Sequence, residues 1–255
     1  YGALSLLQVE ADMPRRVLNT LIDTVEVEED GVARRSDRRG FGALHALTSL
    51  HRPALKDPVF IPHTLWAPDE ADRVFEQIAD QDFLVHHPFQ SFTSVETFLR
   101  AAVSDRNVVA IKITLYRIGA NSPLVDLLIE AAEQGKQVAV LVELKARFDE
   151  RNNIAWANRL EEAGIHVVYG LVNLKVHCKL CLVVRQETDG IRRYAHLATG
   201  NYNRVTSQIY TDVGLFTADE RILNDVSEVF NALTGYSSQR SHEALLVAPG
   251  GLRQG

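Results

Sequence analysis

Apolar segments with the character of β-strands alternate with amphipathic helical segments between residues 108 and 169, and this alternation constrains the fold more than any other feature. The strand segments span 108–115, 137–142 and 165–169. A β-α-β-α-β order implies right-handed crossovers and parallel neighbouring strands covered by helices. The sequence therefore predicts the α/β class, with a mostly parallel sheet flanked by helices.

Helix start and stop signals agree with this order. Ser122 and Pro123 supply an N-cap and a first-turn proline, and Gly135 ends the first helix. Asp149 caps the second helix, which Gly164 ends. Both inter-strand segments are therefore predicted to be helical.

A further buried strand is predicted over 174–184, because Leu, Val and Cys dominate this segment and it contains no Gly or Pro. It carries His177 and Lys179, and residues two apart on a strand face the same side. One interpretation is a hydrogen-bonded core histidine with a lysine at a strand end. The other is a nucleophile beside a phosphate-binding cation, and these residues alone leave both open.

The two cysteines, Cys178 and Cys181, form a Cys-x-x-Cys pattern that is typical of zinc or redox sites. Residues three apart on a strand face opposite sides, so the two sulfurs should diverge and not share a metal or a disulfide. So low a cysteine count also indicates a reducing, cytoplasmic setting.

The net charge and the lengths of the apolar runs restrict the classes of partner that the chain is expected to bind. The net charge of −6 argues against a general nucleic-acid binder, although an acidic chain can hold a local basic pocket. No run of about eighteen apolar residues is present, so no transmembrane helix is expected.

Prolines divide the chain into two parts. Four of them (Pro53, Pro58, Pro62 and Pro68) predict a linker without regular structure. We expect residues 1–65 to be the C-terminal part of a preceding domain plus this linker, and residues 66–255 to be the main domain. The chain starts at Tyr1 without an initiator methionine, and we expect it to be a piece of a longer protein.

Cationic and amide side chains follow several predicted strands. Arg117 follows 108–115, Arg147 lies shortly after 137–142, and a Gly-Asn turn follows a strand expected at 193–198. Ligands of open α/β sheets gather at the carboxyl ends of strands, so these groups should converge on one crevice with His177. Arginine binds phosphate oxygens in pairs, which favours a polyanionic ligand.

A histidine in such a crevice has two possible roles. It can act as a general base or attack phosphorus itself. An imidazole with a reference pKa of about 6.5 is mostly neutral at pH 7, and neighbouring cations lower the pKa further. The free ring nitrogen favours covalent phosphoryl transfer through phosphohistidine.

Several motifs, in order along nearly the whole chain, resemble the bacterial polyphosphate kinase family of the type with phospholipase D-like catalytic domains. They are Leu84-Val85-His86-His87-Pro88-Phe89-Gln90-Ser91-Phe92, Ile113-Thr114-Leu115-Tyr116-Arg117, Val142-Glu143-Leu144-Lys145-Ala146-Arg147-Phe148-Asp149-Glu150, Val176-His177-Cys178-Lys179, Gly200-Asn201-Tyr202-Asn203, Tyr210-Thr211-Asp212 and Phe230-Asn231-Ala232-Leu233-Thr234-Gly235. The resemblance implies a phospholipase D-like α/β fold, with residues 1–65 from a middle domain and 66–255 as the first catalytic domain.

The resemblance also implies an activity, namely reversible transfer of the ATP γ-phosphate to inorganic polyphosphate through a phosphohistidine. His177 matches the phosphorylated residue, and Lys179 would neutralise charge on the moving group. Arg117 and Arg147 match the magnesium–triphosphate site, where they would bind phosphate, since an arginine has no lone pair for a metal.

The remaining expectations concern the nucleotide and the assembly. Tyr210 matches a nucleotide-contacting tyrosine, and Asn201 and Asn203 are expected to contact the cofactor or phosphate. The implied partners are ATP or ADP, Mg²⁺ and polyphosphate, with no nucleic acid, and the full-length protein is expected to be a cytoplasmic homo-oligomer. Family members carry further domains, so the resemblance implies that the chain is an incomplete enzyme.

Two alternatives stay open. His177-x-Lys179 with Gly200-Asn201-x-Asn203 also resembles half of a phospholipase D site, which would suit a phosphodiesterase. Val184 stands where that superfamily has an aspartate, which argues against the diesterase. The second alternative is an inactive fragment that only binds polyanions.

Overall fold

The computed structural model divides the chain into two compact units, Tyr1–Val59 and Phe60–Gly255. It describes residues 4–36, 44–116, 118, 122–143, 150–170, 175–235, 242–249 and 251–252, with only the backbone at 150–153. The assignment of residues 1–65 to a preceding domain stays a prediction. Among the described residues, none of the helices has the length and apolar character needed to cross a membrane.

The first unit is a small β-α-β arrangement. Strand β1 (Leu7–Glu10) pairs in parallel with β2 (Val32–Arg35), and α1 (Arg15–Val25) connects them. Val9, Leu18 and Val27 are its buried apolar residues. A one-turn helix, α2 (His45–Thr48), follows, and short 3-10 turns lie at Glu29–Gly31 and Pro53–Leu55.

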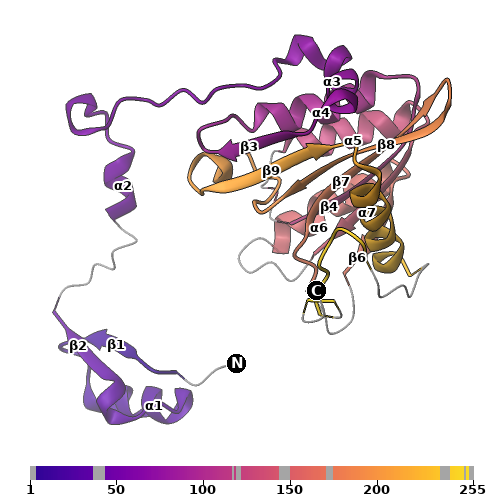
Figure 1. Cartoon of the computed structure of the whole chain (residues 1–255). Coiled ribbons are helices and arrows are strands. Elements are labelled where there is room, and N and C mark those ends of the chain that lie inside the picture. Colours follow the sequence, from indigo (N-terminus) through magenta and orange to yellow (C-terminus); the bar gives the residue numbers. More distant parts are fainter. Residues whose placement is uncertain are drawn as a thin grey trace. The chain divides into compact units, whose positions relative to one another are not determined.

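The second unit is built on one seven-stranded sheet with the order β3-β9-β8-β7-β4-β5-β6 (Figure 1). In that order the strands are β3 (Phe83–His87), β9 (Asp212–Thr217), β8 (Gly190–Ala198), β7 (Lys179–Glu187), β4 (Val108–Leu115), β5 (Gln137–Val142) and β6 (His166–Tyr169). The sheet and its helices confirm the predicted α/β class.

The expectation of a mostly parallel sheet is wrong for the strand pairing. Only β4–β5 and β5–β6 pair in parallel, and the other four neighbouring pairs are antiparallel. The crossover rule holds for residues 108–169, but a tight turn joins β7 to β8 as a hairpin, which forces antiparallel pairing there. Five of the seven strands nevertheless run in one direction, with β7 and β9 opposed.

This topology gathers seven strand ends at one edge. The carboxyl ends of β3, β4, β5, β6 and β8 lie there together with the amino ends of β7 and β9. We call this the site edge and mark it by Leu115, Val142, Ala198, Lys179 and Asp212.

Helices cover both faces of the sheet. The larger core includes residues of α3 (Val74–Asp80), α4 (Thr93–Ser104), α5 (Pro123–Glu133) and α6 (Glu150–Glu162), preceded by a 3-10 turn at Pro68–Arg73. The smaller core lies under α7 (Glu220–Leu233). Because strand side chains alternate, Cys181 and Val183 of β7 enter the larger core and Leu180 and Leu182 enter the smaller one.

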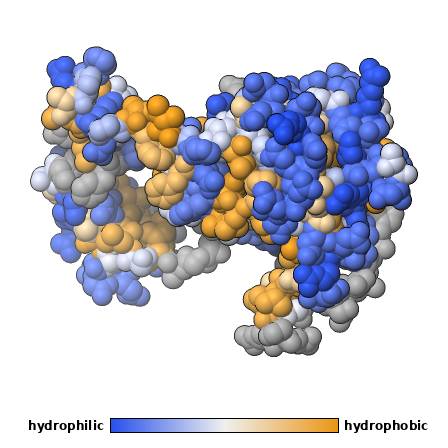
Figure 2. Space-filling view, turned by 45° about the horizontal axis from the view of Figure 1, so that its top comes forward, coloured by the Kyte–Doolittle hydropathy of each residue, from blue (hydrophilic) through white to orange (hydrophobic). Residues whose placement is uncertain are grey.

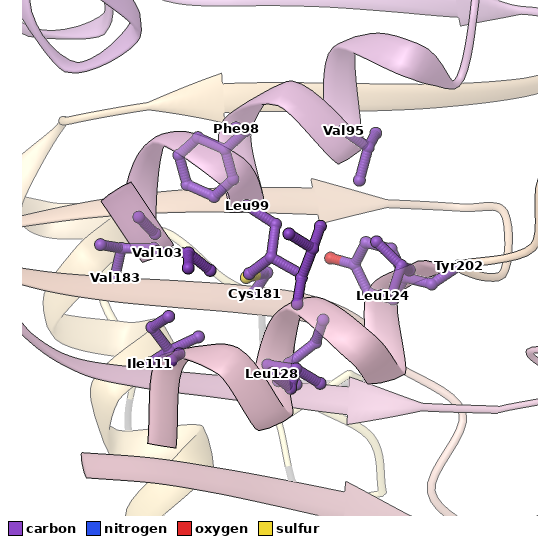
Figure 3. Close-up of a cluster of buried hydrophobic side chains, with 14 of the residues drawn as sticks. Val95, Phe98, Leu99, Val103, Ile111, Leu124, Leu128, Cys181, Val183 and Tyr202 are labelled. Atoms are coloured by element: carbon purple, nitrogen blue, oxygen red, sulfur yellow. The ribbon is translucent and has the colours of Figure 1, made fainter. Parts of the chain in front are cut away.

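The larger core packs α4 and α5 directly on the central strands. Figure 3 shows Leu99, Leu124 and Leu128 from these helices beside Ile111 and Cys181 of the sheet. All five side chains are at most 2% exposed. Burial of this cluster therefore holds together β4 and β7, two neighbouring strands that both reach the site edge.

The predicted helix boundaries are observed in part: Pro123 begins α5, but Ser122 makes no side-chain cap hydrogen bond, and Asp149 lies outside the described residues. Asp219 caps α7 by accepting hydrogen bonds from the backbone N–H groups of Arg221 and Ile222 (2.9 and 3.3 Å). Gly135 and Gly164 end α5 and α6 with φ of 84° and 77°, a left-handed conformation that favours glycine. Local signals thus set where these helices begin and end.

Hydrophilic residues cover most of the face in Figure 2, and hydrophobic residues reach the surface in separate patches. One exposed apolar side chain is Leu84 of the edge strand β3, at 65% exposure. It offers a matched contrast to Leu128, which is fully buried.

We expect Leu128→Ala to lower the free energy of unfolding by about 2–5 kcal/mol, because it leaves a cavity between α5 and the sheet. Leu84→Ala should change it by less than about 1 kcal/mol, since that side chain is largely solvated already. Urea unfolding of both variants measures the difference. Equal losses would contradict the assigned burial.

Candidate functional site

Three side chains from the segment entering β7 surround one aromatic ring at the site edge. Lys175, His177 and Lys179 alternate along the chain, and Tyr116 directly follows β4. The Nζ atoms of Lys175 and Lys179 lie 5.3 and 5.4 Å from the centroid of the Tyr116 ring. The imidazole of His177 lies 5.4 Å from the same centroid at an interplanar angle of 76°.

His177 lies just outside the strand that was predicted to bury it. Strand β7 begins at Lys179, and His177 is solvent-exposed. The interpretation as a core histidine is therefore wrong. The expectation that His177 and Lys179 share a side of the chain agrees with their common contact to Tyr116.

Lys179, in contrast, is buried, at 4% exposure. Its ammonium group donates a hydrogen bond to the carbonyl oxygen of His177. Loss of solvation lowers the pKa of Lys179, and the positive charge of Lys175 lowers it further, while Asp212 acts in the opposite direction. A cation is thus held against the backbone of the exposed histidine.

Side chains from two strand ends hold the backbone on either side of His177. The Glu143 carboxylate, which follows β5, accepts a hydrogen bond from Val176 N–H at 3.0 Å. The Thr114 hydroxyl of β4 donates to Cys178 C=O at 2.9 Å and accepts from Leu180 N–H at 3.0 Å. These bonds continue the link between β4 and β7 beyond the last ladder pair and fix the direction in which His177 leaves the sheet.

The loop after β8 closes one side of the edge around Asp212. Thr199 Oγ1 donates to Asp212 Oδ1 at 2.8 Å and accepts from Val213 N–H at 3.0 Å. A Cβ at Gly200 would lie 2.6 Å from the Asp212 carboxylate, so only glycine leaves room for this approach. The tight Gly-Asn turn that the sequence predicts therefore packs against the Asp212 carboxylate, whose charge opposes the lowering of the Lys179 pKa.

The amide residues of this loop differ from one another. Within the part of the chain that the structure describes, Asn201 Oδ1 is buried without a hydrogen-bond partner. Asn203 Oδ1 accepts hydrogen bonds from Val205 and Thr206 N–H (2.9 and 3.1 Å), so that oxygen stabilises the following turn. Tyr210 is 62% exposed.

A buried histidine lies beneath this loop. His196 of β8 is 1% exposed, and its Nδ1 lies 3.0 Å from the Tyr202 hydroxyl. Burial, aided by the nearby His87, lowers the pKa of His196 to about 3. A Cβ at Gly214 would lie 2.5 Å from Nε2 of this ring, so the neighbouring strand also requires glycine.

Beside His177, an apolar pocket of about 560 Å³ extends toward α7. Lys175, His177 and Lys179 line it together with apolar residues of β7, β8, α7 and the segment 245–249. Cys178 contacts the smaller core here while Cys181 lies in the larger one, so the two sulfurs face opposite sides of the strand.

The structure brings together only some of the predicted site residues. His177, Lys179, Asn201 and Asn203 lie at the site edge, whereas Arg117 and Arg147 fall outside the described residues. Sequence reasoning gave no role to Lys175, Thr114 or Asp212. The two-residue strand period that paired His177 with Lys179 also points back to Lys175 and would have found it.

Comparisons with known proteins agree on one family. A family model described as "Polyphosphate kinase C-terminal domain 1" matches residues 73–239. Polyphosphate kinase 1 of Chlorobaculum tepidum is 49% identical over 249 residues, covering 98% of this chain and 36% of that protein. The polyphosphate kinase of Mycobacterium avium is 50% identical over 259 residues, covering 100% of this chain and 36% of that protein.

A solved structure gives the same result. The crystal structure of polyphosphate kinase from Porphyromonas gingivalis matches with a TM-score of 0.70 at 31% identity, covering 93% of this chain and 38% of that one. The chain therefore spans a little over a third of the length of these relatives.

Replacing the Thr114 hydroxyl tests the connection between β4 and β7. Thr114→Val keeps the shape but leaves Cys178 C=O and Leu180 N–H without this partner, so we expect a loss of about 1–3 kcal/mol in the free energy of unfolding. Thr114→Ser keeps the hydroxyl and should lose less. A valine variant as stable as the wild type in urea unfolding would contradict the role of these bonds.

The low pKa of His196 predicts that the folded protein loses stability as the pH falls. The unfolded chain gains a proton on this residue near pH 6.5, while the folded chain gains it only near pH 3. The contribution of neutral His196 is therefore complete above about pH 6.5 and is lost by about 1.4 kcal/mol per pH unit as pH falls below it. Unfolding titrations from pH 7 to 4 should give a shallower slope for His196→Gln, and parallel profiles would refute the assignment.

Proposed function

The chain belongs to the polyphosphate kinase family, and from this membership we propose that it carries the nucleophile for reversible transfer of the ATP γ-phosphate to inorganic polyphosphate. The relatives named polyphosphate kinase are nearly three times as long, so the activity of a whole protein is part of this proposal. The proposed intermediate is a phosphohistidine on His177.

The observation that carries the proposal is the exposed imidazole of His177 between two lysines over Tyr116. An exposed ring can meet a phosphoryl group, whereas a core histidine cannot. The backbone bonds from Glu143 and Thr114 hold the segment, which reduces the cost of orienting the nucleophile. The ammonium groups of Lys175 and Lys179 beside Tyr116 favour an anionic substrate over a neutral one.

The reaction would proceed in two displacements. A lone pair of a ring nitrogen of His177 forms the N–P bond, and the bond between the γ-phosphorus and its bridging oxygen breaks, so that ADP leaves with the electron pair. A terminal oxygen of polyphosphate then attacks the same phosphorus and the N–P bond breaks. Lys179, held against the His177 carbonyl, would stabilise the charge on the phosphoryl group in both steps.

Mg²⁺ would enter with the nucleotide. Within the described ranges, no group of three or more His, Cys, Asp or Glu side chains could hold a metal ion by itself. Mg²⁺ is commonly bound through substrate phosphates and water, with few protein ligands, and a site lined by His177 and lysines fits that mode. Bound in this way, the ion would neutralise phosphate charge.

The remaining site residues would hold the substrates. Arg117 and Arg147 would bind the triphosphate, and exposed Tyr210 would stack on the nucleotide. Asn201 has a buried amide oxygen without a described partner, which leaves it available to orient a bound group. Asn203 would act by shaping the loop, since its amide oxygen bonds the following turn.

Incubating the chain with ATP labelled at the γ-phosphate, in the presence of Mg²⁺, tests the proposal. We expect acid-labile, base-stable label on the protein that disappears in His177→Ala and persists in His166→Ala, an exposed histidine of β6. Label that persists in His177→Ala, or none on the wild type, would contradict it. Cleavage of a phosphodiester substrate would instead favour a phospholipase D-like hydrolase.

A further inference from the structure

Lys175 and Lys179 contact the same tyrosine ring but differ in what their ammonium groups can reach. The Lys179 ammonium is buried and donates to the His177 carbonyl. Lys175 is exposed, and its Nζ lies 5.3 Å from the Tyr116 centroid at the mouth of the apolar pocket. Only Lys175 is therefore placed to meet a group arriving from solvent on the N-terminal side of His177.

The two ammonium groups form a like-charge pair. Their Nζ atoms lie 5.3 and 5.4 Å from the same Tyr116 centroid, so the two charges are near each other and repel, in line with the lowered pKa of Lys179. Of the ion pairs between described residues, none involves either lysine. The face of Tyr116 offsets part of this repulsion, and an anion bound between the lysines would offset more.

We propose that Lys175 forms a second phosphate subsite, which binds the phosphate next to the one that His177 attacks. This inference rests on the proposed function. The ligand is a condensed phosphate, either the β-phosphate of a nucleoside triphosphate or the penultimate phosphate of inorganic polyphosphate. A single orthophosphate would fill only the position in front of His177.

The spacing of the chain suits this assignment. Alternate residues of an extended segment lie about 6.6 Å apart, so Lys175 and Lys179 flank His177 on opposite sides along the chain. Successive phosphates of a condensed chain share a bridging oxygen and are therefore close neighbours. The long side chain of Lys175 can reach the second phosphate while the first faces the imidazole.

The subsite would act on the leaving group. When the N–P bond forms, the bridging oxygen keeps the electron pair of the broken P–O bond and becomes a terminal oxygen of the departing phosphate. Negative charge therefore grows on the phosphate that Lys175 contacts. An ammonium group that donates a hydrogen bond to it stabilises the transition state more than the ground state and transfers no proton.

Calorimetric titration of the full chain with inorganic triphosphate and with orthophosphate, at fixed ionic strength and without nucleotide, tests the subsite. We expect Lys175→Gln to bind triphosphate about tenfold more weakly, the scale of one charge-assisted hydrogen bond, and orthophosphate less than about twofold more weakly. Lys175→Arg should retain triphosphate affinity within about threefold. Arg106→Gln, which removes an exposed cation next to the amino end of β4, should change neither.

Three outcomes would overturn the subsite. The first is unchanged triphosphate binding in Lys175→Gln. The second is an equal loss for both ligands, which would mean that Lys175 only adds to the general positive field of the site. The third is a wild type that binds no triphosphate. Because titration needs no phosphoryl transfer, a chain that binds triphosphate through Lys175 but takes up no label would contradict only the proposed function.

Discussion

The pairing of β7 between β4 and β8 is the constraint on which the site depends. Strand β7 runs antiparallel to both neighbours, so its amino end lies at the edge where β4 and β8 end. If it ran parallel to β4, His177 would lie at the opposite edge, away from Tyr116. The ladder from Lys179↔Ala198 to Glu187↔Gly190 and the burial of Cys181 and Val183 hold this register. Register matters because a one-residue slip would turn Lys179 to the other face of the sheet.

The transition from ladder hydrogen bonds to side-chain hydrogen bonds explains how the exposed His177 is held in place. The β4–β7 ladder ends at Ile113↔Cys181, and the Thr114 hydroxyl then bonds the backbone at Leu180 and Cys178. One step further, the Glu143 carboxylate bonds Val176. The backbone on both sides of His177 is therefore fixed while its imidazole stays in solvent. The buried Val176 makes the segment rigid, and the exposed imidazole of its neighbour His177 stays accessible to solvent.

Local chemistry in the sequence predicted much of this fold, and long-range pairing set the rest. A first-turn proline and a terminal glycine located α5, and apolar runs located β4 and β5, because both signals act over a few residues. Strand β9 was not predicted, since Asp212–Thr217 mixes polar and small residues and forms by pairing with β3 and β8. The antiparallel order also depends on pairing between distant segments, which periodicity does not encode.

The candidate site was predicted in the same uneven way. His177 and Lys179 were found from spacing two apart and from the family motif, and both are at the site edge. The prediction of a strand over 174–184 placed His177 inside it, but β7 starts only at Lys179, two residues after His177, and the ring is exposed. Thr114 bonds Cys178, 64 positions further along the chain, and Asp212 acts electrostatically on Lys179 from 33 positions away. No local pattern reveals either interaction.

The two ends of β7 differ in how their cationic side chains are paired. At the end away from the site, Arg185 pairs with Asp105 at 2.7 Å and with Glu187 at 3.1 Å, so its charge is neutralised within the fold. At the site edge, no described carboxylate lies within ion-pair distance of Lys175 or Lys179. A net charge of −6 therefore coexists with a local positive field at this end of β7. Tyr116 offsets part of the repulsion between the two lysines, and an anion bound under the proposed function would gain affinity by relieving the rest.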